Sequence, residues 1–233
     1  MVSYNRVSLA RKKELDQLDG VSAILSRLFK FILTHKTKLV SGLVIVFVAM
    51  ALFTGVFYFR NRSETIAFNE LNNCEAKYNS EHMENNSPKE VYEAVNNDYR
   101  LILKNHSGTV AAKMSKIRLA GICYDAGHFE DAVSLYQKAL PDFKENPYFK
   151  SMILNGLAYS YEAGHNKSEA IKYFEMVASD NKSAMKDEAL YNLGRIFDET
   201  GETKKSLEIY KRLFEEHPDS MYNKFAGEKV ASG

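Results

Sequence analysis

Apolar residues follow three patterns along this chain. From position 39 to position 59 they run without interruption by any charged residue. Just upstream, from position 21 to position 32, they recur every three or four residues with polar residues between them. After position 110 this spacing continues and is organised in a longer period. The patterns predict a helix that is apolar on every side, an amphipathic helix over about 21–33, and an array of amphipathic helices.

The longer period combines small and aromatic residues. A small residue is followed by a second one twelve positions on and by an aromatic residue four positions further, and this triplet recurs at intervals of 38 and 36 residues. The triplets are Ala120–Ala132–Tyr136, Ala158–Ala170–Phe174 and Gly194–Ser206–Tyr210. A period of this length is typical of a helical solenoid, in which each unit buries its apolar face by stacking on its neighbour.

Each unit is predicted to contain two antiparallel helices joined by a turn with a glycine. The predicted pairs are Lys113–Tyr124 with Phe129–Leu140, Met152–Glu162 with Ser168–Val177, and Glu188–Glu199 with Lys204–Glu216. We expect Pro141 and Pro218 to end the second helices of the first and third pairs, because proline cannot donate a helical hydrogen bond. The turn glycines are expected to adopt the positive φ that favours the end of a helix.

The spacing of these residues resembles that of tetratricopeptide repeats (TPRs). The third unit carries Leu190-x2-Leu193-Gly194-x2-Phe197 and Ser206-x3-Tyr210-x2-Leu213-x4-Pro218, the second Leu154-x2-Leu157-Ala158-x2-Tyr161 and Ala170-x3-Phe174-x2-Val177, and the first Leu119-Ala120-x2-Cys123 and Ala132-x3-Tyr136-x2-Ala139. The resemblance implies an all-α fold with three repeats over residues 111–220, where the alternative is a generic helical bundle. A degenerate helix pair is expected over residues 60–110 and a C-terminal cap over residues 221–233.

In such a solenoid the first helix of each pair lines a concave groove, which is the expected site for a protein partner. The residues expected on the groove side are Met114, Ile117, Arg118, Tyr124, Met152, Asn155, Tyr159, Glu162, Tyr191, Asn192, Arg195 and Asp198. Tyrosine, arginine and methionine are enriched at protein interfaces. The alternative is that these are ordinary surface residues.

The uninterrupted apolar run, residues 39–59, is predicted to be a transmembrane anchor. Its 21 residues, at about 1.5 Å of rise each, match the roughly 30 Å hydrocarbon core of a bilayer. A buried core helix would be amphipathic, and a signal peptide would have a shorter apolar run and a small-residue cleavage site, so an uncleaved anchor is favoured. Ala51 and Gly55 form a small-xxx-small pair at which another membrane helix could approach closely.

The distribution of charge predicts the orientation of this anchor. Residues 1–38 carry eight Lys or Arg against three Asp or Glu, and residues 60–233 carry 23 against 27. Basic flanks stay in the cytoplasm, so the 1–38 tail is expected there, with its amphipathic helix in the headgroup layer, and residues 60–233 on the far side. Arg60 and Arg62 weaken this bias without reversing it. The mildly acidic main body gives no reason to expect nucleic acid.

No pattern in the sequence predicts catalysis. A Gly-rich phosphate loop, G-x-S-x-G, H-E-x-x-H and C-x-x-C are all missing, and the six histidines are not clustered as a zinc site requires. Cys74 and Cys123 could pair in an oxidising compartment, although a small buried thiol is favoured for Cys123. We expect no enzymatic activity, no cofactor, no metal and no small-molecule substrate.

The order of these parts resembles the YfgM-like family of ancillary SecYEG translocon subunits in the bacterial inner membrane. The resemblance implies a periplasmic module that contacts secreted chains beside the translocon and passes them to periplasmic chaperones. Two other interpretations stay open: a tethered scaffold of another cell-envelope assembly complex, and a regulatory subunit that signals through its cytoplasmic tail.

Overall fold

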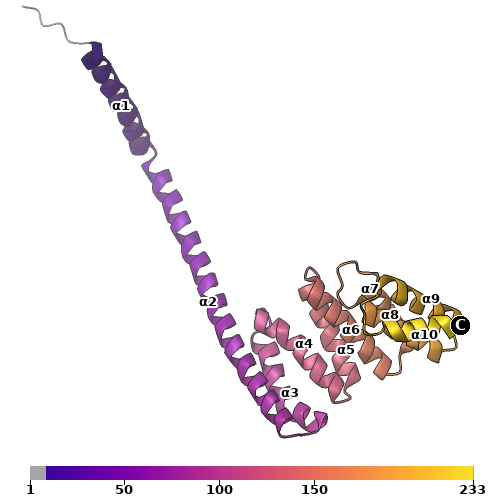
Figure 1. Ribbon diagram of the computed structural model, residues 1–233. Coiled ribbons are helices and arrows are strands. Elements are labelled where there is room, and N and C mark those ends of the chain that lie inside the picture. Colours follow the sequence, from indigo (N-terminus) through magenta and orange to yellow (C-terminus); the bar gives the residue numbers. More distant parts are fainter. Residues whose placement is uncertain (1–8, 233) are drawn as a thin grey trace, which may run out of the picture. The chain divides into compact units, whose positions relative to one another are not determined.

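The chain is helical in both of its parts (Figure 1). The computed structural model describes the backbone of residues 9–232 and the side chains of residues 22–232. The described residues form ten α-helices and no strand. They divide into two units, Met1–Phe59 and Arg60–Gly233, with residues 1–8 of the predicted tail outside the described part.

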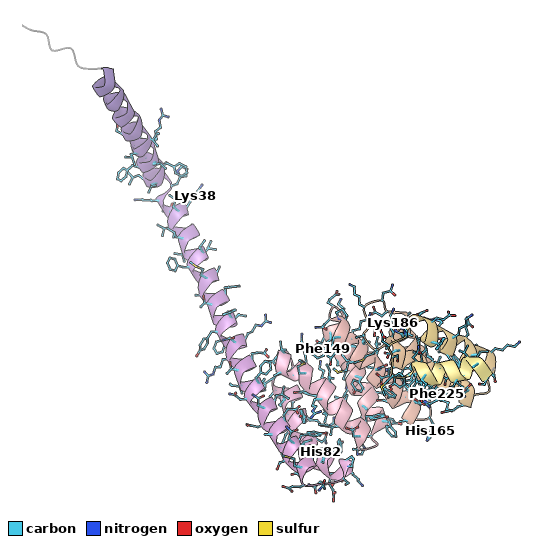
Figure 2. The ribbon with its side chains drawn as sticks, in the orientation of Figure 1. Lys38, His82, Phe149, His165, Lys186 and Phe225 are labelled. Atoms are coloured by element: carbon cyan, nitrogen blue, oxygen red, sulfur yellow. The ribbon has the colours of Figure 1, made fainter. Side chains whose placement is uncertain are left out.

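The N-terminal unit is made of α1, Leu9–Thr34, and the first part of α2, Lys36–Met83. α1 contains the amphipathic stretch predicted over about 21–33 and begins well before it. No side chain from residue 22 to residue 59 is buried, and the side chains of this part of α2 project outward without a covering neighbour (Figure 2). Among the described residues, α2 alone is long and apolar enough to cross a membrane, by length and composition.

The C-terminal unit is a stack of helices that follow one another in sequence and in space. After the last part of α2 come α3 (Pro88–Asn105), α4 (Val110–Asp125), α5 (Phe129–Phe143), α6 (Pro147–Ala163), α7 (Lys167–Ser179), α8 (Lys186–Glu199), α9 (Thr203–Glu216) and α10 (Asn223–Ser232). From α3 to α10, each helix packs against the next. Each predicted repeat therefore corresponds to one helical pair: α4 with α5, α6 with α7, and α8 with α9.

The small and aromatic triplets form the core of this stack. All nine triplet residues are buried, and Phe174 and Tyr210 are almost fully enclosed. Gly194 lies so close to the ring of Tyr210 that a Cβ there would stand 2.6 Å from a ring carbon. Ser206 Oγ also donates to the carbonyl of Gly194 at 2.9 Å, which joins α9 to α8. The small residues thus allow the close helix approach that the sequence predicted.

The last part of α2 belongs to this stack. Its Ala67, Leu71 and Cys74 are buried in the common core. The carboxylate of Glu64 accepts hydrogen bonds from the backbone N–H groups of Val110 and Ala111, each at 3.0 Å. These N–H groups have no partner within α4, so Glu64 caps that helix from α2.

Two local expectations are wrong. Pro141 does not end the second helix of the first pair, because α5 continues to Phe143 with the proline inside its last turn. In the second turn Gly164 has φ −78°, and His165 instead adopts the positive φ of 62°. His165 lies 38 residues after Gly127 and 36 before Gly201, which have φ of 82° and 77°. Histidine thus occupies the position that glycine holds in the other two turns.

Candidate protein-binding face

The twelve residues predicted to line a groove lie on α4, α6 and α8, and we call the surface that they form the first-helix face. Nine of them are partly exposed. Ile117, Asn155 and Asn192 are buried, with exposed fractions of 9%, 5% and 5%. These three residues were expected on the surface of the groove, but their side chains lie beneath it and support the face from within. The binding role of the other nine stays a prediction.

Asn155 and Asn192 are buried because they belong to a hydrogen-bonded cluster between α6 and α8. Tyr159 Oη donates to Glu188 Oε1 at 2.6 Å, and Asn155 Nδ2 donates to Glu188 Oε2 at 3.3 Å. Asn192 Nδ2 donates to Tyr159 Oη at 2.7 Å. Burial, together with the hydrogen bond to Glu188, raises the pKa of Tyr159, so its phenol stays neutral. The cluster fixes the spacing of two neighbouring repeats on this face.

The charged residues of the first-helix face are paired with other residues of the chain. Arg118 Nε donates to Glu75 Oε1 at 3.0 Å, linking α4 to α2. The nearest oxygen of Glu162 lies 2.6 Å from Arg195, and Asp198 lies 2.6 Å from Lys229 of α10. All four charges that the sequence placed on the face are therefore neutralised locally. A partner would meet a surface with little unpaired charge.

Aromatic rings fill the space between these pairs. The rings of Tyr124 and Tyr159 have centroids 6.5 Å apart, which connects α4 to α6. Tyr191 of α8 stacks on Tyr222, just before α10, at 4.4 Å and an interplanar angle of 16°. Aromatic pairs in such geometries attract one another beyond their area of contact. The face thus offers rigid, amphipathic rings rather than flexible charged side chains.

Sequence reasoning did not find the partners Glu75, Glu188 and Lys229, since each lies two helices along the chain from the residue that it holds. A signal for two of them exists in the sequence. Asn155 and Glu188 are 33 residues apart, and Asp198 and Lys229 are 31 apart, close to one repeat length. Complementary polar residues at this separation indicate contacts between equivalent helices of adjacent repeats.

The chemistry of the unit's other polar groups does not point to a reaction. Within residues 22–232, no group of three or more His, Cys, Asp or Glu is placed to hold a metal ion. Cys74 and Cys123 are buried free thiols, and burial raises their pKa values to about 11 and about 12. Neither is a nucleophilic thiolate at neutral pH.

Known structures resemble this chain in fold. A crystal structure of the nearly identical TPR-like repeats of a putative kinesin light chain from Podosopora anserina aligns at a TM-score of 0.56 and 14% identity, over 70% of this chain and 85% of that one. A single-substitution variant of that protein aligns equally at 15% identity. BtubC (BKLC) from P. vanneervenii aligns at 0.45 and 13% identity, over 74% and 82% of the two chains. The two alignments at 0.56 show a likeness of fold alone. No curated protein matches the chain.

A family model gives the more specific result. The model described as the SusR N-terminal TPR domain matches residues 66–216, from the last part of α2 to the end of α9. No enzymatic family is indicated. Because the match spans well over half of the chain, this protein belongs to the family of the SusR N-terminal TPR domain, and its C-terminal unit is a TPR-like solenoid.

Proposed function

We propose that this chain is a membrane-tethered scaffold whose repeat unit binds segments of other proteins on the first-helix face. The observation that carries the proposal is the face itself: partly exposed tyrosines and methionines on a TPR-like stack, with their charges already paired. Tyrosine loses little conformational entropy on binding and combines apolar area with a polar tip. Binding on such a face would depend on rings and hydrogen bonds and vary little with salt.

The location is part of the same proposal. The apolar helix over residues 39–59 would anchor the chain in a bacterial inner membrane, and the basic residues before it favour a cytoplasmic N-terminus and a periplasmic repeat unit. The whole-chain resemblance to YfgM-like proteins supports an ancillary role at the SecYEG translocon, in which secreted chains pass to periplasmic chaperones.

A crosslinking experiment tests the binding face. The photoreactive residue benzoylphenylalanine is placed at Tyr191 on the face, or at Glu208, which is exposed on the second helix of the same pair. We expect ultraviolet light to join the Tyr191 variant to discrete proteins in living cells, and the Glu208 variant to none. Equal products from both positions, or products from Glu208 alone, would contradict the proposal.

The location and the partner are tested separately. Protease added to intact spheroplasts should remove residues 60–233, and full protection would place the repeat unit in the cytoplasm. Crosslinks from Phe59–Arg62 to the translocation channel would support the translocon, whereas crosslinks to another envelope complex would favour the alternative scaffold. If deletion of residues 2–20 abolished a cellular response while crosslinking from Tyr191 persisted, the regulatory alternative would be supported.

A further inference from the structure

A pocket of about 400 Å³ opens next to the first-helix face. It lies where α2 turns into α3 and where α4 and α6 end, near the residue marked His82 in Figure 2. Tyr124 belongs both to this pocket and to the face, where its ring neighbours that of Tyr159. A polypeptide lying on the face could therefore place one side chain in the pocket.

The walls of the pocket are mostly apolar. Val91 and Ile122, each 2% exposed, form an aliphatic part that is held in the core. Tyr124 and Phe129 form an aromatic part, with ring centroids 5.8 Å apart. The ring of Tyr78 also lines the pocket, but the guanidinium of Arg118 covers it at 4.1 Å. These walls suit a long aliphatic stem, and the rings of Tyr124 and Phe129 are available to a cation.

One carboxylate stands among these walls. Asp125 ends α4 and is exposed at the pocket, and its carboxylate makes no hydrogen bond or ion pair with the side chains of residues 22–232 or with their backbone. Partial burial raises the pKa of Asp125, against the attraction of Arg118 and His82. Arg118 cannot neutralise it fully because that side chain is already hydrogen-bonded to Glu75. With His82 counted as neutral, the formal charges of Glu75, Arg118 and Asp125 sum to −1, which leaves the pocket with an unmatched negative charge.

We infer that this pocket binds a lysine or arginine side chain of a partner polypeptide, with the stem against Val91, Ile122 and Phe129 and the cationic head at Asp125. The inference rests on the proposed function, because it assumes that a polypeptide lies on the first-helix face. An acidic side chain would meet Asp125 with the same charge. An apolar side chain would remove water from the Asp125 carboxylate without replacing its hydrogen bonds, which is unfavourable. Of the common side chains, lysine and arginine match both the apolar walls and the carboxylate.

A randomised twelve-residue peptide library, displayed on phage, tests this on the full chain in nanodiscs. Wild type is compared with Asp125→Asn, which removes the charge, and with Glu93→Gln, which removes an exposed charge outside the pocket. We expect peptides selected by wild type and by Glu93→Gln to carry Lys or Arg at one position about threefold to fivefold above the input, in line with one ion pair of up to about 1 kcal/mol. With Asp125→Asn this enrichment should fall to the input level.

The outcomes separate this inference from the proposed function. If wild type selects peptides but prefers leucine or phenylalanine at that position, or if the basic preference survives in Asp125→Asn, the inference is overturned and the protein-binding function stands. If wild type selects no peptide at all, both fail. A melting temperature of Asp125→Asn at or slightly above that of wild type is expected, since the Asp125 carboxylate makes no hydrogen bond and burial disfavours its charge, and this shows that a lost preference is not a lost fold. Asp125→Glu should retain the basic preference.

Discussion

The two units of this chain, residues 1–59 and 60–233, are both helical and both rich in apolar residues, but they place those residues oppositely. In the N-terminal unit the rings of Phe53 and Phe59 are 75% and 68% exposed. In the C-terminal unit Phe174 is fully enclosed, and even the polar Asn192 is buried against its partners. Helix formation is common to both, so it does not decide which solvent a helix requires. The arrangement of apolar residues around the helix decides whether the helix requires water or an apolar solvent. A helix that is apolar on all sides cannot be covered by a single neighbour.

The largest expected effect comes from placing charged residues in the apolar run of the N-terminal unit. Arginine in place of both Val48 and Leu52, near the middle of the apolar run, should cost about 5–7 kcal/mol of insertion free energy at about 2.5–3.5 kcal/mol per residue. We expect the variant to leave the membrane fraction on carbonate extraction. Glu208→Arg with Glu215→Arg, on exposed positions of α9, should stay in that fraction. A double-arginine variant that remained embedded would rule out residues 39–59 as the anchor.

Replacing a phenylalanine by alanine should give the next largest difference between the two units. Phe174→Ala should lower the free energy of unfolding of the repeat unit by about 3–5 kcal/mol, because a fully buried ring leaves a cavity between α6 and α7. Phe53→Ala should leave it unchanged, since that ring belongs to the N-terminal unit and is 75% exposed. Urea unfolding of the full chain in detergent, followed by tyrosine fluorescence, measures both. Similar losses for the two variants would show that the units do not differ in this way.

The two units also differ in the space around their helical glycines. A Cβ at Gly156 would overlap the ring of Tyr136, so Gly156→Ala should cost about 1–3 kcal/mol of unfolding free energy. Nothing lies within 4 Å of a Cβ at Gly55, so Gly55→Ala should not affect unfolding of the repeat unit. If Gly55 and Ala51 contact another membrane helix, Gly55→Ala should instead weaken copurification of that partner in mild detergent. Unchanged copurification would contradict this contact, and unchanged stability of Gly156→Ala would contradict the close packing.

The positive φ of His165 predicts a smaller effect, which is a gain in stability rather than a loss. His165→Gly should raise the free energy of unfolding by about 0.5–1 kcal/mol. The left-handed backbone costs a non-glycine residue about 1–2 kcal/mol, which glycine avoids. Part of this stabilisation is lost because glycine has a greater conformational entropy in the unfolded chain. The reverse change at the equivalent position, Gly201→His, should lower it by a similar amount. Thermal unfolding monitored by circular dichroism distinguishes the two. A stabilising effect of Gly201→His would refute the equivalence of these turns.

The smallest expected effect concerns acid. Lys150 Nζ, at 2.8 Å, and the Lys182 N–H hold the pKa of Asp180 below its usual value. A lowered pKa in the folded chain contributes stability above the unfolded pKa and loses it as pH falls through the folded one. Asp180→Asn should therefore cost less than about 1 kcal/mol near pH 7, and the difference from wild type should vanish in strong acid. Residues 22–59 contain no carboxylate that could respond in this way. A difference that grew in acid would reverse the assigned sign.

Much of the fold could be predicted because its determinants are local in sequence. The apolar run, the 38- and 36-residue spacing and Pro218 gave the helix pairs and the end of α9 within a few residues. Pro141 was misjudged, because a proline in the last turn removes only one hydrogen bond and packing of the rest of α5 keeps the helix intact. The burial of Asn155 was missed because its partner, Glu188, comes from the next repeat.

The linear spacing of residues establishes that the chain is helical, where the apolar run ends and the repeats begin, and which residues recur in each repeat. These features depend on the spacing of residues along one helix, which a linear chain displays directly. The stacking of the helices, in contrast, establishes that the charges of Arg118, Glu162, Arg195 and Asp198 are paired and that the carboxylate of Asp125 is not. Such pairing is set by which side chains of different helices meet when the pairs stack, and that depends on packing across about thirty residues of chain.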